Sequence, residues 1–253
     1  MGSRRFAERS AVVAGGGSGL GRATCERLAS EGATVWVLDK DGDAAAAVAD
    51  RLQRATALEV DVTDPDQVDA AVDEVVSRHG GIDVMVNSAG IALGATIWET
   101  ATDDWRRVID VNLGGVFFGV RAALRHMIPA RSGAVINIAS NAGLVGRPGQ
   151  GAYCASKGGV VLLTKSAALD AAAYGVRVNC VCPGFTWTPL VEWWVASKED
   201  PERARRDVEQ AQPLGRAGEP DEIAAAIAYL ASNEAAFVTG VAFPVDGGFS
   251  AGA

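Results

Sequence analysis

A tyrosine and a lysine four residues apart, Tyr153 and Lys157, have the spacing that proton transfer requires. Residues four apart on a helix share one face, so the Lys157 ammonium would lie beside the Tyr153 phenol. A free tyrosine has a pKa of about 10, and a nearby positive charge favours its phenolate form. Tyr153 is therefore a candidate general base. Taken alone, the same spacing is more typical of a solvated helix face, so neighbouring motifs must decide between the two interpretations.

A serine at the end of a predicted buried strand is the second candidate. Residues 134–139 form an apolar run typical of a strand covered on both faces, and Ser140 follows it directly. Ligands bind at the carboxyl ends of the strands in open α/β sheets. We therefore expect the Ser140 hydroxyl at the ligand-binding edge of the sheet.

The elements that must position these residues begin with a strand, a glycine turn and a helix. The apolar run 11–14 leads into Gly15-Gly16-Gly17-Ser18-Gly19-Leu20-Gly21, and a helical stretch follows over 22–30. Glycines let backbone amides approach a pyrophosphate, which the free N–H groups and the dipole of the helix then stabilise. This arrangement predicts a dinucleotide-binding turn.

An acidic residue follows at the expected distance. The next predicted strand, 34–38, ends in Asp39, about eighteen residues beyond the last glycine. A carboxylate there accepts hydrogen bonds from both ribose hydroxyls and repels a 2′-phosphate, which favours NAD over NADP. Lys40 next to it leaves some room for NADP, and an ordinary turn residue is the alternative interpretation of Asp39.

Strand and helix signals continue to alternate along the chain, as in a doubly wound α/β fold. The predicted elements are a helix over 41–54, a strand over 57–60, a helix over 65–79, a strand over 82–86 and a helix over 103–131. Asp61 would accept from the adenine amino group or cap the helix that starts near Pro65. Asn112 and two glycines interrupt the last helix, which indicates a close-packing notch or a functional kink.

Composition limits the possible partners. The chain has 253 residues, 49% of them hydrophobic, and a formal charge of -8 with no basic stripe, so we expect a small-molecule partner and no nucleic acid. No apolar run approaches a membrane span. The four cysteines form no Cys-x-x-Cys pair and the two histidines lie far apart, so we expect reduced thiols, a cytoplasmic location and no metal site.

Together these motifs resemble the short-chain dehydrogenase/reductase family over essentially the whole chain. The resemblance implies one Rossmann domain over 1–253, with a doubly wound parallel seven-stranded sheet in the order 3-2-1-4-5-6-7 and helices on both faces. It implies an NAD(P)-dependent oxidoreductase that transfers hydride between a secondary alcohol or ketone and a nicotinamide cofactor. In the mechanism that the resemblance implies, Tyr153 is the general acid/base and Ser140 orients the reacting oxygen of the substrate. Lys157 lowers the Tyr153 pKa and holds the nicotinamide ribose, Asn112 holds a proton-relaying water, and Thr188 binds the carboxamide.

The cofactor site is expected to combine the glycine turn, the acidic positions and the ends of the later strands. Many NADP-dependent relatives of the fatty-acid ketoreductase type carry Arg at position 18, so Ser18 agrees with Asp39 in favouring NAD. The expected cofactor residues are Gly15, Gly17, Ser18, Gly19, Leu20, Gly21, Asp39, Lys40, Asp61, Val62, Asn87, Ala89, Gly90, Tyr153, Lys157, Pro183, Gly184, Thr186 and Thr188.

Substrate recognition is expected outside these motifs. An apolar cluster followed by a charged run predicts an amphipathic lid over 187–214, although its tryptophans would equally suit a subunit contact or the core. Such residues favour an apolar or alicyclic substrate, and Arg147 would add a polar contact or remain on the solvated surface. The candidate substrate residues are Ser140, Leu144, Gln150, Tyr153, Trp187, Trp193 and Trp194.

The helix predicted over 153–174 is apolar nearly all round, which one domain seldom buries. With the resemblance, this predicts a homotetramer or a homodimer built on that helix and the helix bearing Asn112. Two other functions stay open. An NADPH-dependent 3-oxoacyl (acyl-carrier) ketoreductase would need a basic docking patch, and a non-catalytic NAD-sensing scaffold would keep the fold without the chemistry.

Overall fold

The computed structural model describes residues 4–252, and the other residues of the predicted domain, 1–3 and 253, lie outside this range. Seven strands form one parallel sheet in the order β3-β2-β1-β4-β5-β6-β7, which confirms the predicted α/β Rossmann topology. The central strands are mostly apolar because helices cover both of their faces. The strands are β1 Ser10–Ala14, β2 Thr34–Asp39, β3 Ala55–Glu59, β4 Val84–Asn87, β5 Gly133–Ile138, β6 Val176–Pro183 and β7 Ala242–Val245.

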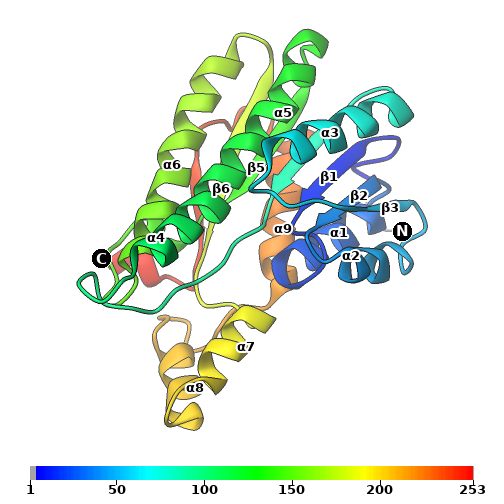
Figure 1. Cartoon of the computed structure of the whole chain (residues 1–253). Coiled ribbons are helices and arrows are strands. Elements are labelled where there is room, and N and C mark those ends of the chain that lie inside the picture. Colours follow the sequence, from blue (N-terminus) through cyan, green and yellow to red (C-terminus); the bar gives the residue numbers. More distant parts are fainter. Residues whose placement is uncertain (1–3, 253) are drawn as a thin grey trace.

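Helices pack on both faces of the sheet (Figure 1). One layer contains α3 Pro65–His79, α4 Thr102–Ile109, α5 Gly115–Ala130 and α6 Gly151–Ala172. The other contains α1 Gly19–Ser30, α2 Gly42–Ala49 and α9 Pro220–Ala231. Each layer has its own core, with Val72 and Val160 on the first face and Leu28 and Ile227 on the second. Because these side chains are buried between the sheet and the helices, they stabilise the packing that holds the carboxyl ends of the strands in place relative to one another.

Two predicted elements have different boundaries or roles in the structure. The helix predicted over 41–54 ends at Ala49, because the chain turns there to enter β3 at Ala55. The cap of α3 is Asp64, whose side chain accepts from the backbone N–H groups of Asp66 and Gln67 at 3.0 and 3.3 Å. Asp61 therefore does not cap this helix, since its Oδ1 accepts from the backbone and hydroxyl of Thr63 instead.

The long helix predicted over 103–131 is broken by a π-helical turn at Asp110–Gly114, between α4 and α5. Asn112 lies in this turn and is fully buried. Its Oδ1 accepts from Ile91 N at 2.8 Å, and its Nδ2 donates to Ile91 O at 2.9 Å and to Ser156 Oγ at 3.1 Å. π-Helical turns are frequent at functional sites. This turn is the kink that the sequence analysis gave as one of two alternatives for Asn112 and the neighbouring glycines.

The predicted amphipathic lid helix is two short helices, α7 Pro189–Ala196 and α8 Pro201–Gln210. Asp200 and Pro201 start the second one, because the Asp200 side chain accepts from Arg203 N at 2.9 Å and proline suits a first helical turn. Both helices stand apart from the two main layers (Figure 1) and share a small apolar cluster around Val195 and Val208.

Candidate functional site

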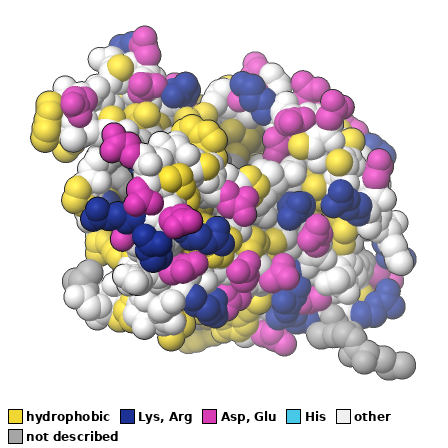
Figure 2. Space-filling model, turned by 90° about the horizontal axis from the view of Figure 1, so that it is seen from below, with side chains coloured by type: hydrophobic (Ala, Val, Ile, Leu, Met, Phe, Trp, Pro, Cys, Tyr) yellow, Lys and Arg dark blue, Asp and Glu magenta, His cyan; other side chains and the backbone are white. Residues whose placement is uncertain are grey.

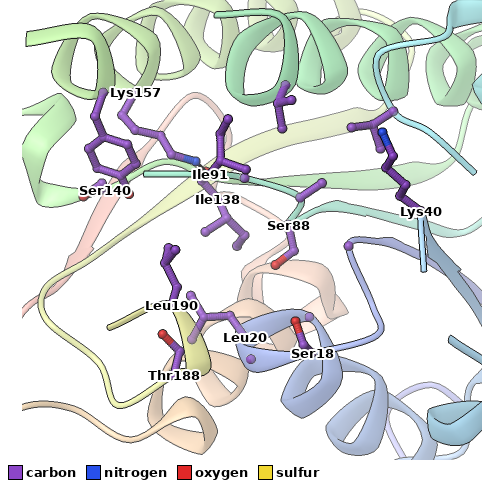
Figure 3. A pocket seen from close by; sticks show the side chains of 18 of the residues that line it. Ser18, Leu20, Lys40, Ser88, Ile91, Ile138, Ser140, Lys157, Thr188 and Leu190 are labelled. Carbon is purple, nitrogen blue, oxygen red and sulfur yellow. Dashed lines mark hydrogen bonds between the residues drawn. The ribbon is translucent and has the colours of Figure 1, made fainter. Parts of the chain in front are cut away.

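A cavity of about 750 Å³ lies at the carboxyl ends of the strands, where the strand order reverses between β1 and β4. Ligands bind at this position in doubly wound sheets. In Figure 3, Ser140, Lys157 and Ile138 lie at one end of the pocket, and Ser18, Leu20 and Thr188 lie across from them. Among the expected site residues, the cavity is lined by Gly15, Ser18, Gly19, Leu20, Gly21, Asp39, Lys40, Asp61, Val62, Ala89, Gly90, Ser140, Tyr153, Lys157, Pro183, Gly184, Thr186 and Thr188.

The glycine turn after β1 fits a dinucleotide. Gly15 has a φ of 76°, and a Cβ added there would lie 2.5 Å from the backbone N of Ala89. A Cβ on Gly21 would overlap the carbonyl oxygen of Gly15. Ser18 precedes α1 with its side chain making no cap hydrogen bond within the described chain, so the amides of the first turn remain available. Such amides are the usual partners of a pyrophosphate.

The acidic residue at the end of β2 is fixed by the same turn. Asp39 Oδ2 accepts from Gly17 N at 2.9 Å, and its Oδ1 accepts from Asp41 N at 3.1 Å. Lys40 points to another carboxylate, since its Nζ lies 2.8 Å from Asp61 Oδ2. This contact lowers the pKa of Asp61 to about 2. The cation nearest to Asp39 in sequence is thus paired with Asp61 and not with Asp39.

The proton-transfer candidates come from β5 and α6. The latter starts at Gly151, so Tyr153 lies in its first turn and Lys157 in the next. Lys157 is buried, its Nζ donates to Ile138 O at 2.8 Å, and it lies 5.8 Å from the centroid of the Tyr153 ring. Ser140 is held at the end of the strand, where its Oγ accepts from Ala142 N at 3.1 Å. The three side chains therefore line the same cavity.

The pKa values differ from the expectation that Lys157 lowers the pKa of Tyr153. Burial raises the pKa of Tyr153, and the contact with the Ser140 hydroxyl and the charge of Arg147 act against this increase. Burial also lowers the pKa of Lys157 to about 8. The Lys157 ammonium donates to a strand carbonyl, and the cation that lowers the pKa of the phenol is Arg147.

Three expected site residues support the cavity from behind and do not line it. Gly17 contributes its backbone N–H to Asp39. Asn87 Nδ2 donates to Asn137 Oδ1 at 2.8 Å, which links β4 to β5 behind the ligand edge. Asn112 fixes Ile91, which itself lines the cavity.

The expected substrate residues other than Ser140 and Tyr153 lie outside the lining of this cavity: Leu144, Gln150, Trp187, Trp193 and Trp194. Trp187 packs under Arg205 at 4.2 Å, and Trp194 packs against Phe185 with ring centroids 6.0 Å apart. Trp193 is 65% exposed. Gln150 precedes α6 at its N-cap position and Leu144 is exposed. Trp187 and Trp194 therefore pack against the α7–α8 cluster, and Trp193 lies on its surface.

The structure adds cavity residues that the motifs did not identify. Apolar ones come from segments adjoining the motifs, namely Ile91, Ile138, Ala139, Leu190 and Val191, and charged ones come from α4 and the π-helical turn, namely Asp103, Arg106, Arg107 and Asp110. The apolar group was accessible from sequence, since each member lies within three residues of a predicted site residue. The charged group had no such signal, because it depends on how α4 leans over the sheet.

Residues 4–252 contain no group of three His, Cys, Asp or Glu side chains arranged to hold a metal ion. Across the same range, no helix has both the length and the apolar character needed to cross a bilayer.

A doubly wound sheet with a glycine turn at its switch point is the fold of dinucleotide-binding enzymes. Residues 14–250 match the family model described as enoyl-(acyl carrier protein) reductase. With the relatives below, this match places the chain in the short-chain dehydrogenase/reductase family. It is an oxidoreductase, and enzymes of this family use nicotinamide cofactors.

The similar proteins span the full length of the chain. A cis-4-hydroxycyclohexanecarboxylate dehydrogenase from Sinomonas cyclohexanicum is 45% identical over 97% of this chain and 98% of its own. A 3-oxoacyl-[acyl-carrier-protein] reductase from Thermotoga maritima is 40% identical over 96% of this chain and 98% of its own. The crystal structure of a levodione reductase superposes with a TM-score of 0.95 at 37% identity, covering 98% of this chain and 100% of that one.

Proposed function

We propose that this chain is an NAD-dependent dehydrogenase of cyclic secondary alcohols, acting in reverse as a ketone reductase. The observation that carries the proposal is one cavity with Asp39 at one end and Ser140, Tyr153 and Lys157 at the other. The first group selects the nucleotide, and the second group moves a proton at the substrate oxygen.

Each residue has a role in the proposed reaction. A bound nicotinamide supplies the hydride acceptor at the substrate carbon. The Tyr153 phenolate takes the alcohol proton during oxidation and returns it during reduction. Ser140 donates a hydrogen bond to the substrate oxygen, and Lys157 holds the ribose of the nicotinamide half. Asn112 holds Ile91 at the cavity wall through two hydrogen bonds to the Ile91 backbone. In the proposed reaction Asn112 also holds the water that passes the proton to solvent.

The proposed substrate class rests on the apolar part of the cavity wall. Ile91, Ile138 and Leu190 line the cavity and give it an apolar surface suited to a ring. The cyclohexane ring in the name of the Sinomonas relative supports the same class. We further propose that 1–253 act as one catalytic unit and that 187–214 close over the substrate, since Thr188 to Val191 reach the cavity.

A second candidate is the acyl-carrier ketoreductase, which the Thermotoga relative favours. Against it stand Ser18 and Asp39, which offer no cation to a 2′-phosphate. On the face in Figure 2, Lys and Arg side chains lie among Asp and Glu side chains, which does not favour docking of an acidic carrier. A non-catalytic scaffold would not require Ser140, Tyr153 and Lys157 to line the same cavity.

Replacement of Asp39 by serine tests the nucleotide preference. The wild type is expected to use NAD better than NADP. Asp39→Ser removes the acceptor for the ribose hydroxyls and the charge that repels a 2′-phosphate, so kcat/KM for NAD should fall by about tenfold or more and that for NADP should rise. Steady-state rates with both nucleotides at saturating alcohol provide the measurement.

The control for this substitution is Asp43→Ser, on the exposed start of α2, which should leave both rates unchanged. A wild type that reduces NADP more efficiently than NAD would refute the assigned preference, as would an Asp39→Ser variant with an unaltered ratio.

We also propose a homotetramer or homodimer built on α5 and α6. Phe117, Leu162 and Leu169 on these helices are 45%, 67% and 81% exposed, which is unusual for large apolar side chains on a helix pair. Leu169→Asp should convert the assembly to smaller species in light scattering. Leu214→Asp, at a leucine 70% exposed on another surface, should not. A wild type that scatters as a single chain at micromolar concentration would contradict the proposal.

A further inference from the structure

Arg147 occupies an unusual position in the loop between Ser140 and α6. Its guanidinium lies 4.8 Å from the ring centroid of Phe185 and 4.4 Å from that of Phe249, so two aromatic rings hold it. Its Nη2 donates to Asn141 Oδ1 at 3.1 Å. Its Nε is buried and has no hydrogen-bond partner within residues 4–252. Arg147 is therefore not the solvated surface residue that was one of its two interpretations from the sequence.

The Asn141 side chain connects this guanidinium to Ser140. Asn141 is 2% exposed, and its Oδ1 also lies 3.4 Å from Ser140 Oγ. Because Arg147 is purely a donor, it holds the amide with the oxygen toward Ser140. The Ser140 oxygen therefore accepts from the Ala142 N–H. Its single proton, which contacts Asn141 Oδ1 only at 3.4 Å, can turn to the substrate oxygen. Loss of Arg147 would let the amide rotate and turn its Nδ2 toward Ser140.

The pKa of the Tyr153 phenol depends on several neighbouring groups. Burial and the Cys154 thiol raise it, whereas the Ser140 hydroxyl and the charge of Arg147 lower it. Lys157 is a second cation near the phenol, with its Nζ 5.8 Å from the ring centroid. Tyr153, Cys154 and the carboxylate of Asp246 are the groups whose charges act on Arg147. The Asp246 oxygens accept from Gly248 N and Ser250 N at 3.1 and 2.9 Å, so backbone donors already satisfy that carboxylate.

We propose that Arg147 is a positioning residue for this reaction, which aligns Ser140 through Asn141 and presents positive charge to the phenolate of Tyr153. The inference rests on the proposed acid/base role of Tyr153. It assigns to a loop arginine part of the electrostatic work that the resemblance gave to Lys157.

The proposal fixes the sign of a pH effect. In alcohol oxidation Tyr153 must be deprotonated, so the rate rises with pH through the pKa of the phenol. The charge of Arg147 opposes the effect of burial, which raises that pKa. Removing the charge should therefore move the rising limb of the pH profile to higher pH. Burial lowers the pKa of Lys157, the other cation near the phenol, to about 8.

Two substitutions at this position separate charge from shape. Arg147→Gln keeps a donor for Asn141 Oδ1 but loses the charge, whereas Arg147→Lys keeps the charge. In profiles of kcat/KM for alcohol oxidation, we expect Arg147→Gln to shift the rising limb upward by about one pH unit, and Arg147→Lys to follow the wild type. The matched control is Arg78→Gln, because Arg78 also lies over an aromatic ring, Trp36 at 4.8 Å, but away from the cavity. NADH affinity should be unchanged in all variants.

The outcomes distinguish this inference from the proposed function. An Arg147→Gln variant that loses the same fraction of activity at every pH, or that matches the wild-type profile, would overturn the inference while leaving the role of Tyr153 intact. A rising limb shifted equally in Arg147→Lys would overturn it as well. Full activity of Tyr153→Phe would instead remove the proposed function on which the inference depends. Thermal unfolding of each variant verifies that the compared proteins are folded.

Discussion

The Tyr153→Phe variant is expected to lose turnover while still binding NADH. The substitution removes the hydroxyl that takes the proton and leaves the ring in place. Positioned acid/base groups contribute factors of about 10² to 10⁴ to the rate, so kcat should fall by at least that range. Initial rates of NADH formation from a secondary alcohol measure the loss, and titration of NADH fluorescence measures the binding.

A matched control exists beyond the end of the same helix. Tyr174 follows α6 and is 40% exposed, with Arg131 over its ring at 5.9 Å, so Tyr174→Phe should retain wild-type rates. If Tyr153→Phe kept most of its turnover with unchanged NADH affinity, the phenol would not be the acid/base, and the proposed mechanism would fail.

Lys157→Met is the second substitution with a large expected effect. The ammonium lies beside the cavity and, in the proposed function, holds the nicotinamide ribose, so both NADH affinity and kcat should fall, the latter by about 10² or more. Stability should change in the opposite direction. Because burial lowers the pKa of Lys157 to about 8, the folded state favours the charged form less than the unfolded chain does. At pH 7, methionine should therefore leave the melting temperature unchanged or raise it.

The combination of lost activity and retained stability identifies a functional lysine. Lys165→Met, at an exposed position of the same helix, should preserve activity and NADH affinity. Should Lys157→Met melt far below the wild type at pH 7, Lys157 would be a structural residue, and its assigned contact with the nucleotide would lose its main support.

The sheet and the glycine turn were predictable because their signals are local. Buried parallel strands read as short apolar runs, and the turn at Gly15 needs a backbone that side chains would obstruct. The meeting of Ser140 with Tyr153 also followed from sequence, because one ends a strand and the other starts a helix at the same edge. These predictions needed no knowledge of how distant loops pack.

The parts that the sequence did not predict depend on side chains from distant segments. From the sequence, the tryptophans of 187–214 suited a pocket wall and packing equally, and in the structure Trp187 and Trp194 pack against the α7–α8 cluster. The role of Arg147 was hidden for a similar reason. Its surroundings come from Phe185 and Phe249, which are far from it in the chain. Local spacing also could not show that the Lys157 ammonium reaches a strand carbonyl.

Isotope transfer from alcohol to nucleotide tests the central claim most directly. Wild-type protein is incubated with NAD and a panel of cyclic secondary alcohols deuterated at the carbinol carbon, and the reduced nucleotide is analysed by mass spectrometry. The proposed function predicts deuterium in the reduced NAD with at least one alcohol, and formation of this product at least about 10² times more slowly with Tyr153→Phe. Release of the deuterium to water, or no reduction of NAD by any alcohol of the panel, would contradict it.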